Sequence, residues 1–369
     1  MGPPGRSVVI AGGGPAGSAA AILLARGGTR PLLIERSREA QDVVCGGFLG
    51  ADAIALLARV GIDPAALGAR PIGRVRLIAG KRVAEADLPF PAAGLSRRTL
   101  DAALISRAAE EGAAVERGVA IRTVDAVTRR IHLADESMIE TGALFLATGK
   151  HELRGLARPV PAALDPALGL RVRLEPSPAL AAALAHRIEL HLFRDGYAGL
   201  LIQDDGAINL CLSVAQSRLK AADGQPARLI EALSNEAPLL AERFGAAASV
   251  GAWSSVARVP YGWRARHSDP GIFRLGDQSA VIASLAGDGI AIALASAASA
   301  AQFYLSGGPA AASAFQLAFA DNARRPVRVA SLLKKMGETL WLAGPLIGLL
   351  GHAPSLVRQA AALTRIEIE

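Results

Sequence analysis

A glycine-rich loop near the N-terminus is the first feature of this chain that could do chemistry. Gly12, Gly14 and Gly17 form a G-x-G-x-x-G pattern directly after a short apolar run and at the start of a helix-forming stretch. Gly12 permits a tight turn, Gly14 lets the backbone approach a pyrophosphate, and Gly17 lets the helix lie close to the strand. The helix N-terminus offers free N–H groups and a positive dipole end to phosphates. The loop therefore predicts a dinucleotide site, which Pro15 and Ala16 also line.

The residues after this helix indicate which part of a dinucleotide the loop would serve. Glu35 ends the next short apolar run, at a position where an acidic side chain accepts hydrogen bonds from a ribose. Arg36 follows it, and we expect both side chains to line the site. A glycine turn that serves the fold alone is the alternative interpretation. The loop and Glu35 are compatible with either FAD or NAD(P).

A second glycine-rich region, far along the chain, discriminates between these cofactors. A short apolar run ends at Gly276 and Asp277, and Gly287, Gly289 and Ile290 begin an alanine-rich helix. These two segments resemble the second signature of the p-hydroxybenzoate-hydroxylase-like flavoproteins. The resemblance implies that Asp277 holds the ribityl chain of FAD and that the glycines lie beside the isoalloxazine ring and the pyrophosphate. A fixed carboxylate suits ribityl hydroxyls, and a helix N-terminus stabilises an electron-rich reduced flavin.

Shorter segments extend this resemblance in order and spacing. The sequence S-R-R-T-L-D-A-A-L resembles the family's S-R-x-x-L-D-x-x-L segment, which implies that Arg97 reaches the cofactor. A C-G-G sequence resembles that of the geranylgeranyl-reductase branch, which implies that Cys45 and Gly46 lie near the flavin ring. The apolar run that ends near Gly149 adds a further strand end to the predicted FAD site.

The chain departs from the family pattern at two places. Many hydroxylases of this fold have an Asp-Gly pair after the strand that ends near Gly149, and that pair is associated with the use of both FAD and NAD(P)H. Here Lys150 and His151 follow instead. NADPH and NADH therefore stay candidate electron donors. Ser284 stands where a proline usually precedes the second glycine pair.

Three side chains are candidates for catalytic roles, and each has a structural alternative. Cys45 is expected beside the flavin, although a buried inert thiol would look the same in the sequence. His151 could face the flavin or a nicotinamide, or belong to a solvated loop. His191 lies in a strand of the predicted substrate domain and could face its pocket, or be an internally hydrogen-bonded sheet histidine. No group of cysteines and histidines has the spacing of a zinc site, so we expect no metal.

These residues require a parallel sheet that brings several strand ends together. Short apolar runs alternate with helix-forming stretches in the first third of the chain, which predicts βαβ units. Longer, more polar strands between residues 168 and 260 predict an antiparallel sheet, and residues 74–87 predict a hairpin that turns at Ala79 and Gly80. The expected fold class is α/β, with a Rossmann-like FAD-binding domain of the GR2 type, an inserted antiparallel α+β substrate domain and a helical C-terminal segment.

The predicted domain boundaries follow these changes in pattern. The FAD-binding domain is discontinuous and takes residues 1–73, 95–165 and 264–308. The substrate domain takes residues 74–94 and 166–263. The C-terminal helical segment takes residues 309–369.

The composition argues against several other classes of protein. The chain has 369 residues, of which 51% are apolar, and a formal net charge of +7. Its arginines are scattered and aromatic residues are scarce, so we expect no nucleic-acid binding. Two cysteines cannot build a disulfide framework, and the N-terminus lacks the pattern of a signal peptide, which together predict a cytoplasmic protein. The sequence leaves the oligomeric state open.

The most apolar late stretch is residues 340–350, which include Trp341 and Leu346. It falls short of the ~20 residues that a membrane-spanning helix needs. We expect this stretch to lie over a pocket, or to contribute to a peripheral contact between the C-terminal helices and a membrane surface.

Three hypotheses of function follow. The first is an FAD-dependent monooxygenase that hydroxylates a lipophilic or aromatic small molecule of polyketide, quinone or isoprenoid type, favoured by analogy because this fold most often hosts that chemistry. The second is a flavin-dependent reductase of isoprenoid-type double bonds, favoured by the C-G-G sequence at Cys45. The third is a non-catalytic flavoprotein that acts as a redox sensor. Lys81 invites a comparison with flavin halogenases, but their W-x-W-x-I-P segment lacks its second tryptophan here, after Trp253.

Overall fold

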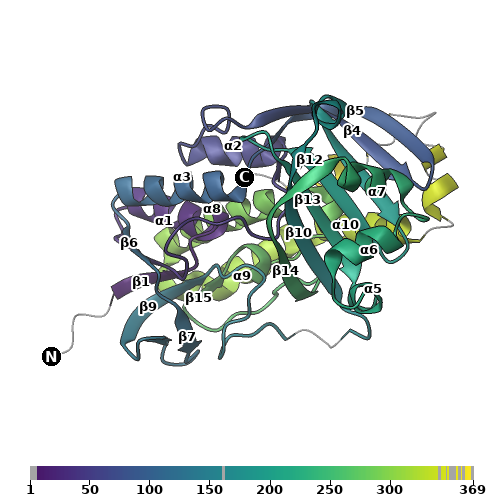
Figure 1. Cartoon of the computed structure of the whole chain (residues 1–369). Coiled ribbons are helices and arrows are strands. Elements are labelled where there is room, and N and C mark those ends of the chain that lie inside the picture. The colour runs from purple at the N-terminus through teal and green to yellow at the C-terminus, as the bar shows by residue number, and fades with distance from the viewer. Residues whose placement is uncertain are drawn as a thin grey trace.

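The computed structural model describes residues 6–159 and 163–339, and then residues 342–345, 347–348, 355, 359 and 362–366. The described residues form two lobes, each built on one sheet (Figure 1). The sheet of the left-hand lobe has seven strands, and that of the right-hand lobe has eight.

The seven-stranded sheet confirms the predicted βαβ pattern. Strand β1 is parallel to β2 and β9, and β6 and β15 extend the parallel part beyond β2 and β9. Strands β7 and β8 continue from β9 as an antiparallel meander. Its strands are β1 (Arg6–Ala11), β2 (Leu32–Glu35), β6 (Ala114–Arg117), β7 (Ile121–Val124), β8 (Arg130–Leu133), β9 (Met138–Leu146) and β15 (Ile272–Arg274).

Both faces of this sheet are covered, which explains its apolar strands. Val8, Val9 and Ile10 of β1 have no exposed surface, as expected for a strand buried on both sides. One face carries the helices α1 (Pro15–Arg26), α3 (Arg97–Glu110) and α8 (Gly289–Gly307), and the β7–β8 meander packs on the other. Pro15 stands in the first turn of α1, where its missing N–H costs nothing.

The eight-stranded sheet is mixed rather than wholly antiparallel. Among its described strands, β4 and β11 form the parallel pair and the other neighbours are antiparallel. Strand β4 belongs to a hairpin from early in the chain. Because no tight turn joins β4 to β11, the two strands can pair in the parallel direction. In order across the sheet, the strands are β14 (Ala247–Val259), β10 (Ala167–Pro176), β13 (Ile208–Ala215), β12 (Gly196–Ile202), β11 (Arg187–Phe193), β4 (Arg70–Ala79), β5 (Arg82–Gly94) and β3 (Phe48–Leu49).

The predicted hairpin exists, but its turn lies one residue later than expected. Ala79 pairs with Arg82, so Gly80 and Lys81 make the turn. Gly80 has a φ of +59°, which suits a two-residue hairpin turn.

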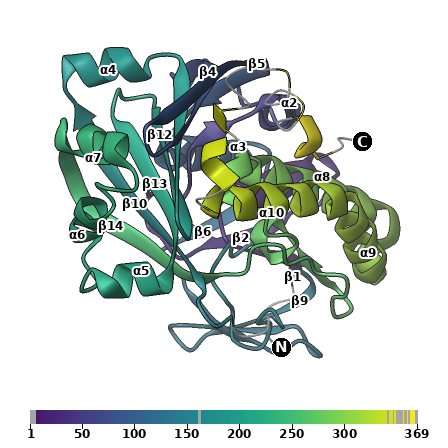
Figure 2. The ribbon, with the colours of Figure 1, turned by 90° about the vertical axis from the view of Figure 1, so that its right-hand side faces the viewer.

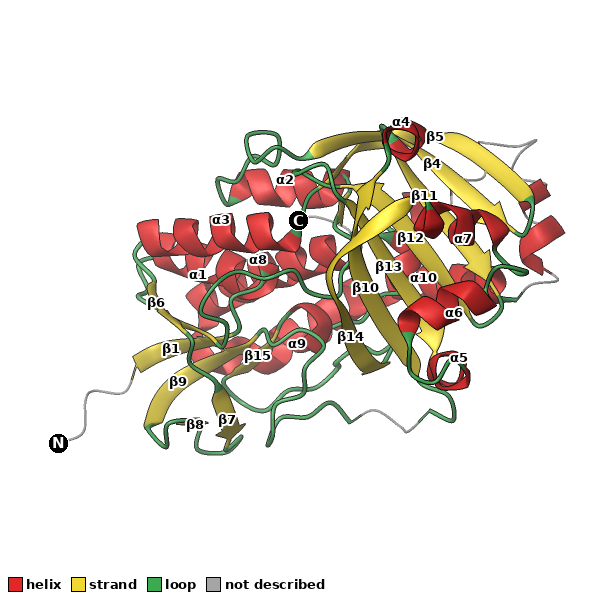
Figure 3. Cartoon of the chain, in the orientation of Figure 1, coloured by secondary structure: helices red, strands yellow, loops and turns green. Residues whose placement is uncertain are grey.

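Short helices cover the face of this sheet that points away from the other lobe (Figures 2 and 3). They bury a leucine-rich cluster that is separate from the core of the first lobe. These helices are α4 (Pro178–Leu184), α5 (Gln216–Ala221), α6 (Pro226–Ala232) and α7 (Pro238–Gly245), whereas α2 (Ala51–Arg59) packs on the first lobe.

The described C-terminal part continues as the helices α9 (Ala312–Asn322) and α10 (Arg324–Glu338). By length and composition, one described stretch, Gly289–Asn322, could cross a membrane, but half of its most apolar window is buried inside the molecule, as in a core helix. Ala343 and Ile347 are buried among residues of the eight-stranded sheet. Trp341 and Leu346, to which the sequence assigned a pocket or membrane contact, lie outside the described residues.

Candidate functional site

A cavity of about 550 Å³ opens at the carboxyl ends of β1, β2 and β9 and extends toward the second sheet. Its volume is typical of a small-molecule or cofactor site. Gly17, Gly46, Gly287 and His191 are not among its lining residues. The other predicted site residues line it: Gly12, Gly14, Pro15, Ala16, Glu35, Arg36, Cys45, Arg97, Gly149, His151, Gly276, Asp277, Gly289 and Ile290.

The glycine loop at this cavity has no room for side chains. Gly12 has a φ of +107°, and a Cβ there would lie 2.5 Å from the carbonyl oxygen of Ala147. A Cβ on Gly17 would overlap the carbonyl oxygen of Gly12. On the cavity side, a Cβ on Gly14 would lie 3.2 Å from Nη2 of Arg97. The loop therefore needs glycine for the turn and for helix packing, as the sequence predicted.

Glu35 supports the glycine loop from the neighbouring strand. Its carboxylate accepts hydrogen bonds from the backbone N–H of Gly13 at 2.7 Å and of Ser37 at 2.8 Å. Each carboxylate oxygen has two lone pairs, so the group can also accept a ribose hydroxyl. Glu35 can therefore shape the loop and bind a ligand at once.

Arg97, at the start of α3, is fixed by a bidentate ion pair. Its Nε and Nη2 donate to the two oxygens of Asp101 at 2.8 and 2.7 Å. Burial opposes the charge of the guanidinium, but the Asp101 carboxylate outweighs this and raises the pKa of Arg97. Arg97 is thus a permanent cation held beside Gly14 and Cys45.

Asp277 stands at the end of β15, in a turn that Gly276 makes with a φ of +55°. Its carboxylate pairs with Nζ of Lys150 at 3.0 Å, and its carbonyl oxygen accepts a hydrogen bond from Arg158 at 2.8 Å. Burial opposes the charge of Lys150, but Asp277 together with Tyr261 and Cys45 outweighs burial and raises the pKa of Lys150. Lys150, which follows Gly149 where the family has Asp-Gly, therefore adds a cation beside the carboxylate expected to bind a ribityl chain.

His151 lies near the β2 end of the cavity. Its Nε2 is 2.8 Å from Nη2 of Arg36. Burial, followed by the charges of Arg36 and Lys150, lowers the pKa of His151. The imidazole is therefore neutral and accepts a hydrogen bond from the guanidinium.

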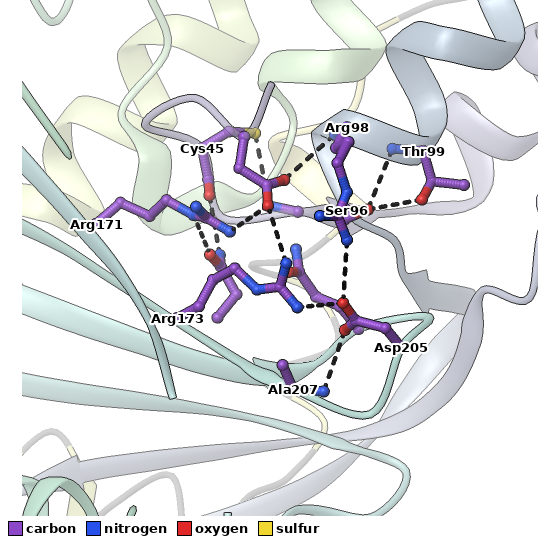
Figure 4. Close-up of polar contacts among 12 residues, drawn as sticks. Cys45, Ser96, Arg98, Thr99, Arg171, Arg173, Asp205 and Ala207 are labelled. Carbon is purple, nitrogen blue, oxygen red and sulfur yellow. Dashed lines mark hydrogen bonds and ion pairs between the residues drawn. The ribbon is translucent and has the colours of Figure 1, made fainter. Parts of the chain in front are cut away.

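The Cys45 loop is tied to the second sheet by a polar cluster (Figure 4). Asn209 of β13 donates to the carbonyl oxygens of Cys45 at 2.9 Å and Gly46 at 2.8 Å. Arg171 of β10 donates to Asn209 at 2.7 Å and pairs with Asp42 at 3.1 Å. Figure 4 shows Arg171 reaching from the sheet to the loop. These bonds fix the backbone at Cys45 and Gly46 relative to both lobes.

The second glycine segment meets the C-terminal part of the chain. Gly287 has a φ of +77°, and a Cβ there would lie 2.7 Å from Cδ1 of Phe48. Asp288, which is almost fully buried, accepts a hydrogen bond from Arg365 at 2.8 Å. Burial raises the pKa of Asp288 to about 7, although Arg365 opposes the shift. This segment therefore depends on a residue close to the C-terminus.

His191 faces away from the cavity. Side chains alternate along β11, and His191 and Glu189 are on the opposite face from Leu190 and Leu192. Nε2 of His191 lies 3.2 Å from Glu189, and neither side chain is exposed. The structure therefore places His191 as an internally bonded sheet histidine.

Sequence reasoning missed Lys150, Asn209 and Arg117 as residues of the site. Arg117 is the register partner of Glu35 on β6 and lines the cavity. Its Nε and Nη2 are buried and have no hydrogen-bond partner. Its place at the carboxyl end of a parallel strand is a signal that the sequence did contain. Asn209 lacked such a signal, because its partner loop lies far away in the chain.

These residues fit FAD in several independent ways. The glycine loop leaves backbone space for a pyrophosphate, and Glu35 retains acceptor capacity for a ribose. The buried, unpartnered atoms of Arg117 can donate to the adenylate end of the cofactor. Asp277 and Lys150 offer an acceptor and donors for the ribityl hydroxyls.

The comparisons with known proteins agree with this fit. Residues 6–140 match the family described as FAD binding domain. A stretch of 122 residues is 38% identical to the chloroplastic geranylgeranyl diphosphate reductase of Nicotiana tabacum. That match covers 31% of this chain and 25% of the relative, so the chain matches about a quarter of the relative's length.

Solved structures resemble nearly the whole chain at low sequence identity. The flavin-dependent brominase Bmp2 has a TM-score of 0.77 and 17% identity, over 97% of this chain and 93% of that one. The probable FAD-dependent monooxygenase pqsL from Pseudomonas aeruginosa has a TM-score of 0.71 and 16% identity, over 93% and 99%. At these identities the likeness concerns the fold. The chain therefore has the fold of these flavin-dependent proteins, and its residues 6–140 match an FAD-binding domain.

Proposed function

We propose that this chain is an FAD-dependent oxidoreductase, namely a monooxygenase that hydroxylates a lipophilic or aromatic small molecule of polyketide, quinone or isoprenoid type. The observation that carries the proposal is the face of the eight-stranded sheet that points toward the cavity. This face is mainly aliphatic on β4 and β11, whereas on β13 and β10 it carries polar side chains, among them Asn209 and Arg171. We call it the cavity-side face. Asn209, which binds the Cys45 loop, belongs to it.

The apolar part of the cavity-side face follows from strand register. Leu77 of β4 is the partner of Leu190 on β11, and Leu192 is the partner of Tyr197 on β12. Side chains of register partners point to the same face. Leu77, Leu192 and Tyr197 pack with Ala343 and Ile347 of the C-terminal part, so a substrate that enters between this part and the sheet would meet aliphatic side chains.

A small group of hydroxyls supplies polar recognition on this face. Tyr261 and Ser284 are hydrogen-bonded at 2.7 Å. The hydroxyl of Tyr197 is buried and makes no hydrogen bond of good geometry, although Ser284 is close enough to influence its pKa. Burial raises the pKa of Tyr197, so the phenol stays protonated and can donate to an oxygen atom of a substrate.

Each part of the chain then has a separate task. Bound FAD supplies two-electron redox chemistry and the activation of oxygen. Gly14, Arg97 and Asp277 would hold the cofactor. The cavity-side face excludes water from the substrate, and Tyr197 orients it by a hydrogen bond.

One observation favours double-bond reduction as the second candidate function. The C-G-G loop at Cys45 is held by two hydrogen bonds from Asn209, and the curated relative that matches part of the chain is a geranylgeranyl diphosphate reductase. Halogenation has less support. Lys81 is exposed in the turn between β4 and β5 and does not line the cavity.

A two-stage experiment separates the candidates. The FAD-loaded protein is mixed anaerobically with NADPH or NADH, which we propose as electron donors, and reduction is followed by flavin absorbance. Isotopically labelled oxygen is then admitted with a polycyclic phenol or an isoprenoid alkene. A phenol that gains one labelled oxygen atom supports the proposal. An alkene that gains two hydrogens without oxygen contradicts it and supports the reductase.

A further inference from the structure

Helix α10 has an outward face that is almost entirely cationic. Its exposed residues between positions 324 and 335 are four cations and one leucine: Arg324, Arg325, Arg328, Leu332 and Lys335. At 3.6 residues per turn, these five positions fall within an arc of about 100°. The acidic residue of this helix, Glu338, is paired with Lys334 at 2.6 Å. The outward face therefore carries no carboxylate of its own.

Neighbouring cations enlarge this surface. Arg264 and Arg266 lie beside the start of α10, and the carboxylate of Asp321 pairs with Arg266 at 3.2 Å. Burial and then the charges of Arg328, Arg266 and Arg324 lower the pKa of Arg264. The guanidinium groups are thus close enough to repel one another, and Asp321 opposes that repulsion only in part. We call Arg264, Arg266 and the outward face of α10 together the basic surface.

The inner side of α10 lies over the proposed substrate region. A Cβ on Gly337 would be 3.2 Å from Leu192 of the cavity-side face. Nζ of Lys334 lies 5.3 Å from the ring centroid of Tyr261. Figure 2 shows α10 crossing the front of the molecule, between the strands of the eight-stranded sheet and α9. One helix therefore connects the substrate region with the basic surface.

We propose that the basic surface binds an anionic membrane, with α10 lying flat on the headgroups. A lipid surface suits it better than an acidic protein or a nucleic acid, because large aliphatic side chains are exposed with the cations. Leu332 on α10 is 59% exposed and Leu317 on α9 is 44% exposed. A basic helix with exposed aliphatic residues is typical of interfacial binding, whereas nucleic-acid surfaces carry aromatics for stacking. The proposal does not depend on the reaction that the flavin performs.

Vesicle co-sedimentation of the full-length, FAD-loaded protein tests this proposal. Vesicles of phosphatidylcholine alone are compared with vesicles that also contain phosphatidylglycerol. We expect binding to the anionic vesicles only, and a steep loss of binding as salt rises and screens the charges. Equal binding to both vesicles, or no binding to either, would overturn the proposal.

A charge-matched pair of variants locates the surface. The triple variant Arg324→Gln, Arg325→Gln and Arg328→Gln removes three cations from α10. Each cation near an anionic bilayer contributes about five-fold to partitioning, so binding should fall by about 100-fold. The control variant Arg122→Gln, Lys220→Gln and Arg258→Gln removes three exposed cations from other elements and should bind within about three-fold of the parent. Equal loss in both variants would show that net charge, not this surface, drives binding.

A single aliphatic change separates a lipid from an acidic protein partner. Leu332→Ser keeps every charge and removes an exposed side chain that would enter the headgroup region. We expect it to weaken vesicle binding by about ten-fold or more, since leucine burial is worth that much. Unchanged vesicle binding by this variant would contradict a helix that lies in the interface. Circular dichroism and flavin absorbance would verify that each variant is folded and loaded.

Discussion

The two faces of the eight-stranded sheet differ in whether their buried hydroxyl and charged groups are paired within the protein. On the cavity-side face, the hydroxyls of Tyr197 and Ser213 are buried without a hydrogen bond of good geometry. Cys211, from the same face, is only partly buried as a side chain, but its surroundings raise the pKa of its thiol to about 12. These groups have donor or acceptor capacity that the protein itself does not use.

The opposite face contains charges that are paired within the protein. The Glu189 carboxylate is fully buried, and it receives Arg76 at 2.6 Å and Arg243 at 3.2 Å. His191 completes the group at 3.2 Å from Glu189. Arg171 on the cavity-side face is also paired, with Asp42, so what distinguishes that face is its unpaired hydroxyls. The comparison teaches that the Glu189 group stabilises the fold, whereas the unpaired hydroxyls are available to a ligand.

The largest expected effect is the loss of the carboxylate at Glu189. In the variant Glu189→Gln, Arg76 and Arg243 lose the buried anion that they share, and Arg76 keeps only its bond to the partly exposed Glu85. Breaking such a pair is strongly destabilising, so the free energy of unfolding should fall by about 3 kcal/mol. Urea denaturation followed by circular dichroism measures this change. FAD affinity of the folded protein should stay the same.

A matched control is available on the same arginine. Glu85 pairs with Arg76 at 2.8 Å but is partly exposed, so Glu85→Gln should cost less than about 1 kcal/mol. If the two variants lost equal stability, burial of the charge would not be what distinguishes the two faces.

The next largest effect is expected for Asn209, a hydrogen-bonded polar residue of the cavity-side face. Asn209→Ala removes two hydrogen bonds to the Cys45 loop and one from Arg171, which should lower the free energy of unfolding by about 2 kcal/mol. The freed loop should also weaken FAD binding, measured by fluorescence titration. Ser213→Ala, which removes a hydroxyl without a partner, serves as the control and should change stability by less than about 0.5 kcal/mol.

Asp277→Asn tests the cofactor side of the same cavity. The amide keeps the shape of the side chain but loses the charge that pairs with Lys150, and it is a weaker acceptor for ribityl hydroxyls. We expect FAD affinity to fall about ten-fold, equivalent to ~1.4 kcal/mol. Equilibrium dialysis of FAD against the folded variant measures it, and unchanged affinity would refute the assignment of the ribityl contact.

The pH dependence of stability tests the buried charged group around Glu189, because His191 belongs to that group. Burial, followed by Arg243 and Arg76, lowers the pKa of His191 below 6.5, although Glu189 opposes the shift. Below pH 6.5 the unfolded chain binds a proton at this residue and the folded chain does not. The free energy of unfolding therefore falls as the pH falls. The slope from one such group is at most about 1.4 kcal/mol per pH unit. His191→Gln should flatten the stability curve between pH 6.5 and 5, whereas His186→Gln, at an exposed position, should leave it unchanged.

The sequence was sufficient for features that depend on neighbouring residues. The glycine loop and Glu35 are local signals, because Gly12, Gly17 and Glu35 follow strand ends in one βαβ unit. The orientation of His191 was not predictable in this way. Alternation along β11 puts His191 opposite Leu192, but which face meets the flavin depends on distant pairing with β4 and β12. Arg243, which pairs with the Glu189 partner of His191, comes from α7, and two strands lie between β11 and that helix.

The smallest expected effect on stability is that of Tyr197→Phe, and it is the sharpest test of the comparison. Removing a buried hydroxyl that makes no good hydrogen bond should change the free energy of unfolding by less than about 0.5 kcal/mol. If that hydroxyl instead serves a substrate oxygen, the variant should bind a phenolic ligand about ten-fold more weakly, while an apolar analogue without the oxygen binds equally to both proteins. Changes in flavin absorbance during titration report both affinities. Because the expected loss appears with only one of the two ligands, it distinguishes a recognition contact from a packing defect, which would weaken both.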